Sequence, residues 1–429
     1  MSGKVRLERA DRSQIRLEAV DLEALVAVEH RVRSVWAFVA GLDLRALHEA
    51  VKSREGTAGR PAIDPAILVC LWLYATLENV GSARELARLT RAHVVYRWIC
   101  GGVEVSYHTL SDFRVEQAAF LDDLLTRSVT ALMEAGVTSL EEIAQDGLRT
   151  RASAGGGSFR RRATLEQKLA AARERVERLK GEAQSDPAAS AKRRAAAQAR
   201  AAQDAERRAQ AALEALKELE KRKAARKKSG KDGDKQAPPR ASTSDPEARV
   251  MKMADGGFRP AYNLQIAMDP QSGAVVGVQV SNEGSDKGLV MPMVEQIKQR
   301  FARLPRRWLA DTGFASNQTA EQLARASPDG VEAYMPIPTG FGGKPAVAPP
   351  AKMPAARAWH ERMAREDAKA VYRRRSLVEW VNAGMRNRGL VRLTVRGMAR
   401  AKAVLLWQAL AHNMLCLMRN GMNALPAPA

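Results

Sequence analysis

Near the C-terminal end of the chain lies the stretch AVYRRRSLVEWVNAGMRNR, residues 370–388, from which the rest of the sequence can be interpreted. The stretch contains no proline and its one glycine falls late, so the sequence predicts one continuous helix. At about 100° per residue, four side chains fall within roughly 60° of one another on one face of that helix. They are Tyr372, Arg375, Glu379 and Arg386.

This face would place one carboxylate among guanidinium groups and a phenol. Such an arrangement suits a site that binds a divalent metal ion and a polyanion together, because hard cations take oxygen ligands and guanidinium groups pair with phosphates. The alternative is a solvated charged face with ordinary pairs three and four residues apart. The chemistry of the helix leaves both interpretations open.

The spacing of the four residues resembles the signature helix of the DDE transposases of bacterial insertion sequences. In that family a Tyr is followed by Arg, Glu and Lys at the same intervals. The resemblance implies that Glu379 is the third metal-binding carboxylate, and that Tyr372, Arg375 and Arg386 hold phosphates of the transposon ends. This chain departs from the pattern at Arg386, where a planar guanidinium group stands in place of the compact ammonium group of Lys. The resemblance also requires two Asp residues upstream, each at the end of a strand.

Two short motifs meet this requirement. QDGLRTRAS, residues 145–153, overlaps a predicted strand over 143–151 and resembles the family's first catalytic motif, with Asp146, within that strand, as the acid. RRWLADTGFAS, residues 306–316, predicts a short strand that ends at Asp311 and resembles the second motif. Three other acids have local explanations, because Asp255 and Asp269 lie in turns and Asp286 lies at a predicted helix start.

The composition indicates a soluble globular protein with a polyanionic partner. The chain has 429 residues, a formal net charge of +21 and 45% hydrophobic residues. Three widely spaced cysteines suggest a reducing compartment. The N-terminus is charged throughout, without the apolar segment of a secretory signal, and the longest apolar run, residues 66–77, is too short to span a bilayer. We therefore expect no membrane association and a cytoplasmic, nucleoid-associated protein.

Residues 1–135 predict a helical DNA-binding domain. Asp64 and Pro65 form a helix start, and Ser82 with Glu85 forms a capping box before a basic helix. Compact helices with short connections suit a DNA binder related to the helix-turn-helix, and the alternative is a bundle that only packs on the next domain. The pattern GRPAIDP…LENVGSARELARLT…YHTLSDFR also resembles the N-terminal helical domain of many insertion-sequence transposases.

Residues 160–235, called the arm below, predict an antiparallel helical hairpin. Apolar residues recur at alternating intervals of three and four in two segments, which is typical of two helices that pack along a seam. Residues 160–228 carry 21 Lys and Arg against 10 Asp and Glu, a net of +11. This excess suits contact with duplex phosphates, and a solvated spacer is the alternative. Candidate DNA contacts at its start are Arg160, Arg161 and Arg162.

The sequence as a whole predicts an α+β protein. The order of a strand with Asp146, two hairpin strands, a helix and a strand with Asp311 is what an RNase H-like mixed-sheet core requires, and we place that core at 138–420. The arm interrupts it, the helical domain at 1–135 precedes it, and a loose tail at 421–429 follows.

The predicted function is that of a DNA transposase that cleaves insertion-sequence ends and transfers the strands into a target duplex. Asp146, Asp311 and Glu379 would hold two Mg²⁺ ions in one cluster, with Mn²⁺ able to substitute. The partners would be the transposon ends and target DNA, with a homodimer in the synaptic complex. The alternatives are a catalytically inactive DNA-binding protein derived from a transposase, and an RNase H-like nuclease without strand transfer.

Overall fold

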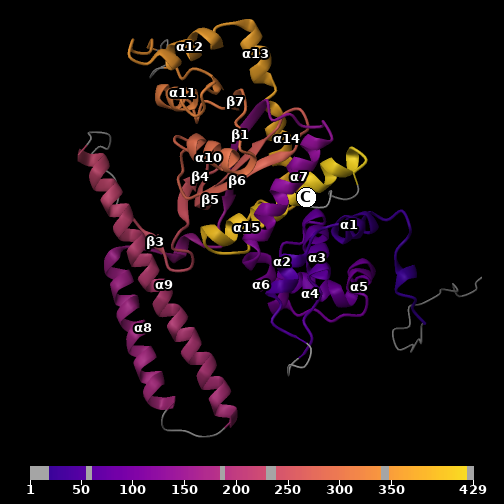
Figure 1. The fold of residues 1–429 in the computed structure, drawn as a ribbon. Coiled ribbons are helices and arrows are strands. Elements are labelled where there is room, and N and C mark those ends of the chain that lie inside the picture. The colour runs from indigo at the N-terminus through magenta and orange to yellow at the C-terminus, as the bar shows by residue number, and fades with distance from the viewer. Residues whose placement is uncertain (1–18, 55–59, 184–188, 229–237, 340–346, 423–429) are drawn as a thin grey trace, which may run out of the picture.

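A mixed sheet forms the centre of the structure (Figure 1). The computed structural model describes residues 19–54, 60–183, 189–228, 238–339 and 347–422. Within these residues the sheet has six strands, in the order β4-β5-β1-β7-β8, and β6 pairs with β5 beyond the end of β4. The strands are β1 (Glu142–Arg151), β4 (Arg249–Lys252), β5 (Phe258–Met268), β6 (Val275–Ser281), β7 (Arg307–Ala310) and β8 (Glu332–Tyr334).

The central strand β1 is antiparallel to β5 and parallel to β7. The predicted hairpin is confirmed, because β5 and β6 are antiparallel neighbours joined by a turn at 269–274. Gly273 permits this turn at a φ of +75°, and the Asp269 carboxylate accepts hydrogen bonds from the backbone and hydroxyl of Ser272. The strand β7 ends at Ala310, directly before Asp311. The α+β class with a mixed sheet is therefore confirmed.

Helices cover both faces of the sheet. On one face, Ala144 and Leu148 of β1 share a core with α14 (Ser376–Asn387) and α15 (Met398–Arg419). On the other face, Ile143 and Trp308 share a core with α10 (Val290–Phe301), α11 (Asn317–Ala324) and α12 (Pro354–Met363). The two sets alternate along the strands because successive strand residues point to opposite faces.

The N-terminal part is helical as predicted, and its elements are η1 (Glu23–Leu25), α1 (Arg31–Ala40), α2 (Arg45–Ala50), α3 (Pro65–Leu77), α4 (Ala83–Ala92), α5 (Val94–Cys100), α6 (Tyr107–Glu116) and α7 (Ala118–Glu134). Asp64 caps α3 and Ser82 caps α4, as expected. These helices share one buried cluster with α15 and the sheet, so the N-terminal and C-terminal parts are packed together.

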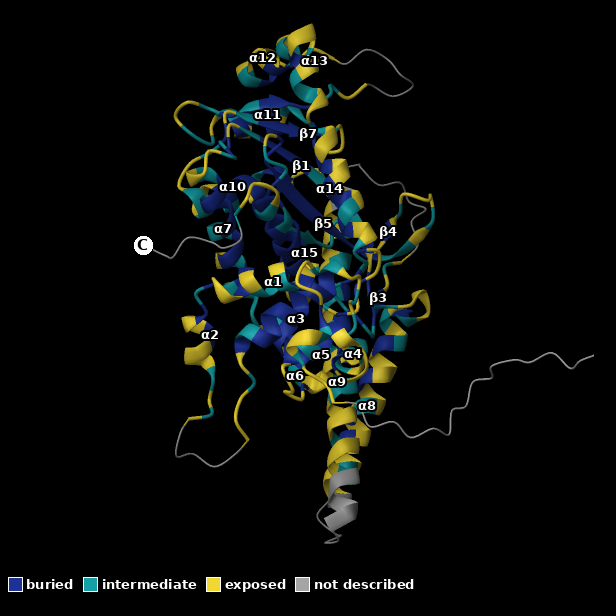
Figure 2. Cartoon of the chain, turned by 90° about the vertical axis from the view of Figure 1, so that its right-hand side faces the viewer, coloured by how far each residue is buried: buried dark blue, intermediate teal, exposed yellow. Residues whose placement is uncertain are grey.

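The arm contains the predicted hairpin, with α8 (Arg162–Ala183) and α9 (Ala189–Lys228). The ion pairs Arg162–Glu220 and Arg173–Glu206 show that the helices run antiparallel. Leu165, Leu169 and Leu216 lie in their shared core. The hairpin projects from the sheet and is mostly exposed (Figures 1 and 2). Two short strands, β2 (Phe159–Arg160) and β3 (Ala241–Ser242), pair at its base.

Parts of the expected organisation fall on residues outside the described ranges. They are residues 1–18 and 55–59 of the helical domain, residues 184–188 and 229–235 of the arm, residues 236–237 and 340–346 of the core, and all but 421 and 422 of the tail.

The prediction of one continuous helix over residues 370–388 is wrong. The structure has α13 (Glu366–Arg373) and α14, separated by Arg374 and Arg375. The backbone tightens there, because the N–H of Arg375 donates to the Tyr372 carbonyl and the N–H of Val378 to the Arg375 carbonyl. The two arginine side chains reach different acids of β1: Arg374 pairs with Glu142, and Arg375 lies beside Asp146. The break lets both contacts form.

The helix α15 is the one described helix whose length and apolar composition would allow it to cross a membrane. Most of its apolar stretch is buried inside the protein, as in the core helix of a globular protein. The expected buried helix at 66–77 is confirmed within α3, where Val69, Cys70 and Leu71 are fully buried.

Candidate active site

Asp146 lies in β1, next to Asp311, which directly follows the neighbouring strand β7. In the parallel pairing of β1 with β7, Gln145 is in register with Ala310, so the two acids directly follow paired residues. Alternation along the strands directs both carboxylates to the face of the sheet that α14 and α15 cover. We call this the α14 face.

Asp146 is a largely buried acid with few compensating contacts. Its Oδ1 accepts a hydrogen bond from the N–H of Gly147 at 2.9 Å, and its Oδ2 accepts one from Asn382 Nδ2 of α14 at 2.8 Å. Burial raises the pKa of Asp146 to about 6, and the carboxylates of Asp311 and Asp286 act in the same direction. Arg375, 3.8 Å from Oδ1, opposes the shift. Bringing a cation to this carboxylate would therefore be favourable.

Asp311 begins the turn that follows β7. Its Oδ1 accepts a hydrogen bond from the N–H of Gly313 at 2.7 Å. A side chain at Gly313 would crowd this turn, because an added Cβ would lie 2.9 Å from Asp311 Oδ1 and 3.4 Å from Asp286 Oδ2. The second motif therefore places its acid at the end of a strand, as predicted, beside the first.

Glu379 lies on α14, on the same side of the sheet as the two Asp residues. Its carboxylate is exposed and forms an ion pair with Arg375, whose guanidinium also lies beside Asp146. Among the described residues, no three acidic, His or Cys side chains form a group that could hold a metal ion. The expectation that all three carboxylates form one metal-binding group is therefore not met in this conformation, because Glu379 is paired with Arg375.

A fourth acid, Asp286, lies close to the other carboxylates. It accepts hydrogen bonds from Asn263 Nδ2 at 2.7 Å and Gln265 Nε2 at 2.9 Å. Gly147 leaves room for it, since a Cβ there would lie 2.5 Å from Asp286 Oδ1. The interpretation of Asp286 as a helix start is wrong, because α10 begins at Val290 and its N-cap is Leu289. Asn263 and Gln265 occupy alternate positions on the buried strand β5. This polar pattern was the sequence signal that a polar side chain, here Asp286, packs against the strand.

The predicted phosphate-binding residues are spread over two regions. Tyr372 is half-buried at the end of α13, and the Arg375 guanidinium lies 5.9 Å from its ring centroid. Arg386 is exposed in the last turn of α14. At the start of the arm, Arg160 is half-buried, Arg161 is exposed and Arg162 is paired with Glu220.

Two family models match the chain. A transposase DDE domain matches residues 228–414, which include Asp311, Glu379 and the signature helix region. A transposase domain (DUF772) matches residues 20–116, which form the N-terminal helices. The chain belongs to the DDE transposases of insertion sequences. No curated protein and no solved structure gave a significant match.

Membership of the DDE transposases indicates an enzyme of the polynucleotidyl-transferase type that acts on DNA. The match with the DDE domain begins after Asp146, which lies beside Asp311 through the pairing of β1 with β7.

The transposase also has a basic groove of about 610 Å³ at the base of the arm. Its cationic lining comes from Lys168 and Arg175 of α8, Arg208 of α9 and Arg396. Thr243 and Ser244 add hydroxyl groups, the remaining lining residues are alanines, and none is Asp or Glu. The small side chains leave the positive charges accessible. Sequence reasoning identified the charge of the arm but not this groove, which depends on how the two helices meet the loop after β3.

Proposed function

We propose that this transposase cleaves DNA at insertion-sequence ends and transfers the resulting strands into target DNA, with Asp146, Asp311 and Glu379 as the catalytic carboxylates. The observation that carries the proposal is the placement of Asp146 and Asp311 side by side on the α14 face, with Glu379 linked to Asp146 through Arg375. These acids come from three segments far apart in the sequence. Their convergence on one face is what a shared site would require.

The proposed core is RNase H-like, over residues 138–420. The strand order β6-β5-β1-β7-β8, with the first three antiparallel and the last three parallel, supports this assignment. We treat residues 1–135 as the N-terminal DNA-binding domain and the arm as an insertion in the core.

The chemistry of the carboxylates fits Mg²⁺. Asp146 and Asp311 offer hard oxygen donors, and the raised pKa of Asp146 reports negative charge that has too little compensation. When bound by Asp146, Asp311 and Glu379, two Mg²⁺ or Mn²⁺ ions would supply activation of the attacking water or 3′-hydroxyl and stabilisation of the leaving oxygen. To join the other two carboxylates, Glu379 has to give up its ion pair with Arg375.

The cationic side chains would position the DNA. Arg375 would exchange Glu379 for a phosphate, since a guanidinium binds either group with two parallel hydrogen bonds. Tyr372 and Arg386 would hold neighbouring phosphates of the same end. The basic groove and Arg160, Arg161 and Arg162 would hold the duplex further away, without reading its sequence. We expect a homodimer in the synaptic complex and activity on the nucleoid in the cytoplasm.

Two other functions differ in what they predict. A catalytically inactive DNA-binding protein would bind ends without cutting them, and an RNase H-like nuclease would cut without joining. The presence of acids at all three matched positions favours the enzyme over the binder. The cations beside Glu379 favour strand transfer over simple cleavage, because a nuclease has less need to hold a cut end.

End cleavage by purified protein tests the proposal. The substrate is duplex DNA that carries the sequence flanking the coding region, incubated with Mg²⁺. Asp146→Ala, Asp311→Ala and Glu379→Ala should each abolish cleavage while end binding persists. Asp255→Ala and Glu366→Ala change exposed acids away from the site and should leave cleavage unchanged. Full cleavage by any one of the first three variants would refute the role of that residue.

A further inference from the structure

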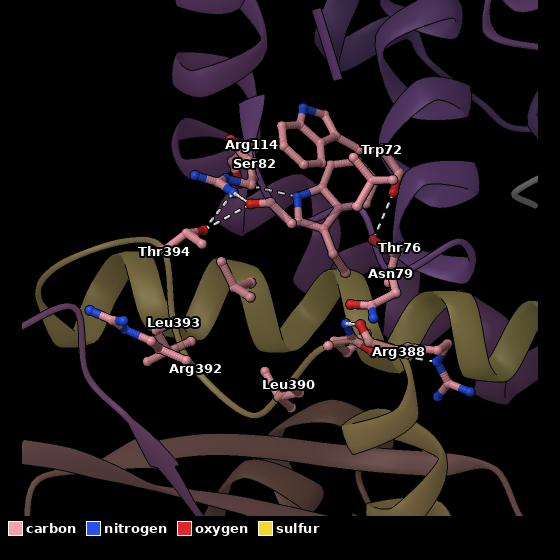
Figure 3. A pocket seen from close by; sticks show the side chains of 16 residues that line it. Trp72, Thr76, Asn79, Ser82, Arg114, Arg388, Leu390, Arg392, Leu393 and Thr394 are labelled. Atoms are coloured by element: carbon pink, nitrogen blue, oxygen red, sulfur yellow. Dashed lines mark hydrogen bonds between the residues drawn. The ribbon is translucent and has the colours of Figure 1, made fainter. Parts of the chain in front are cut away.

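A cavity of about 280 Å³ lies between the N-terminal helices and the segment that follows α14. Figure 3 shows the residues that line it, which come from α3, residues 79–82 before α4, α6, residues 388–394 and α15. The cavity thus joins the region that matches the transposase domain (DUF772) to the region that matches the DDE domain. None of its lining residues is Asp or Glu.

Arg114 is a buried cation in the wall of this cavity. It is 6% exposed, and its guanidinium lies 4.8 Å from the ring centroid of Trp72. Its Nη1 donates hydrogen bonds to the Gly81 carbonyl at 2.5 Å and to Thr394 Oγ1 at 3.1 Å. Its buried Nε has no hydrogen-bond partner, and no described carboxylate forms an ion pair with it. Burial lowers the pKa of Arg114 to about 10, so the group remains charged at neutral pH.

A buried charge without a counter-ion is unfavourable, because the protein interior solvates it less well than water does. Neutral acceptors and one ring face compensate Arg114 only in part. The side chain is therefore suited to an anion that enters the cavity.

Two further features of the cavity favour an anion. Ser82, the N-cap of α4, lines the cavity, and the positive end of the dipole of that helix attracts negative charge. Arg392 is exposed and lines the same cavity from the opposite segment. Arg388 lines it as well, and its buried Nη2 has no hydrogen-bond partner.

We propose that this cavity is a phosphate-binding site, in which Arg114 and Arg392 hold one phosphate group at the N-terminus of α4. A guanidinium pair beside a helix N-terminus is a chemistry that recognises phosphate oxygens. The phosphate can belong to a DNA backbone or to a small phosphate-bearing molecule. The site requires neither metal ions nor the three catalytic carboxylates, so it can be tested apart from the proposed reaction.

Calorimetric titration of the full chain with inorganic phosphate, without Mg²⁺ and in a phosphate-free buffer, tests the site. Arg392→Ala should weaken phosphate binding at least tenfold. Arg400→Ala removes an exposed arginine of α15 that does not line the cavity, and should leave binding unchanged. Arg114→Gln should abolish binding, and thermal unfolding will report whether that variant folds. Because Arg392 is exposed, its variant carries the test if the Arg114 variant does not fold. No phosphate binding by the natural chain, or equal loss in the Arg392 and Arg400 variants, would overturn the proposal.

Duplex binding identifies the source of the phosphate. If it belongs to DNA, Arg392→Ala should reduce the slope of log K against log salt by about 0.9, the effect of one lost phosphate contact, relative to Arg400→Ala. An unchanged slope together with lost inorganic phosphate binding would assign the site to a free phosphate-bearing molecule.

Discussion

At the scale of single residues, the charge of Asp146 destabilises the folded protein, although the residue has a proposed catalytic role. The buried carboxylate has a pKa of about 6, against 3.8 for the free side chain. The folded protein therefore binds the proton more tightly than the unfolded chain does, and folding becomes less favourable as pH rises from about 4 to about 6. Above pH 6 the full penalty is present. A residue that serves stability would not destabilise the fold through its charge, whereas a carboxylate that binds a metal ion would do so while the metal is absent.

This penalty predicts that Asp146→Asn stabilises the metal-free protein. At pH 8 in a chelator, the free energy of unfolding should rise by up to about 3 kcal/mol, the equivalent of the pKa shift, and the gain should disappear near pH 4. The amide can be accommodated, because the buried Asn382 Oδ1 has no hydrogen-bond partner and can accept from it. Urea unfolding at both pH values measures the effect, with Asp255→Asn as the control at an exposed acid. Destabilisation at pH 8 would show that the charge is well compensated.

Gly147 keeps space for Asp286 beside the first acid. Gly147→Ala would bring a Cβ to 2.5 Å from Asp286 Oδ1 and 2.8 Å from Gln265 Nε2. Overpacking of this kind typically reduces the free energy of unfolding by about 1 to 3 kcal/mol. Gly155→Ala is the matched control, since nothing lies within 4 Å of its added Cβ and its φ is negative. Equal stability of the two variants would contradict the close packing at Gly147.

The residue-scale predictions from sequence succeeded where the signal was local. Asp311 is the first residue after a short apolar strand and before a glycine turn, and this pattern can be read directly. Asp286 was missed because its partners, Asn263 and Gln265, approach it only through the fold of β5 and the loop before α10. Nothing near Asp286 in the sequence indicates that contact.

At the scale of elements, periodicity predicted the arm but not the break between α13 and α14. The apolar seam of α8 and α9 is internal to the hairpin, so its spacing alone determines how the helices pack. The break at Arg374 and Arg375 depends on Glu142 and Asp146, which belong to a strand more than 200 residues away. Because that contact is tertiary, helical spacing over 370–388 could not reveal it.

The basic groove at the base of the arm leads to a prediction about DNA binding. Replacing Lys168, Arg175 and Arg208 together by Gln should weaken duplex binding and reduce the salt slope by about 2.7, the sum for three lost phosphate contacts. The matched control replaces three arm cations that are already paired with acids, namely Arg173, Lys180 and Arg207. Fluorescence anisotropy across a salt series gives both slopes. If both triple variants had the same slope, the groove would have no special role and the arm would bind DNA diffusely.

At the scale of the whole molecule, one buried cluster joins the N-terminal helices, α15 and one face of the sheet. The order of motifs in the sequence predicted β1, the hairpin strands β5 and β6, the helix α10 and β7 in their order along the chain, but not β4. The way the N-terminal helices pack on α15 could not be predicted, because the broad apolar face of α15 does not specify its partners. The proposed catalytic carboxylates lie on the α14 face of the same sheet. The strand β1 therefore contributes both to the site, through Asp146, and to the shared core, through Ala144 and Leu148.

The central claim is that three carboxylates from distant segments share metal ions once DNA is bound. Titration of Mn²⁺ into the protein, with and without duplex DNA from the insertion-sequence end, measures this most directly. We expect Mn²⁺ to bind at least tenfold more tightly with DNA, because a phosphate then takes Arg375 away from Glu379. Asp146→Asn, Asp311→Asn and Glu379→Gln should each lose that binding, while Glu366→Gln should retain it. Mn²⁺ affinity that is unchanged in all three variants would contradict the account.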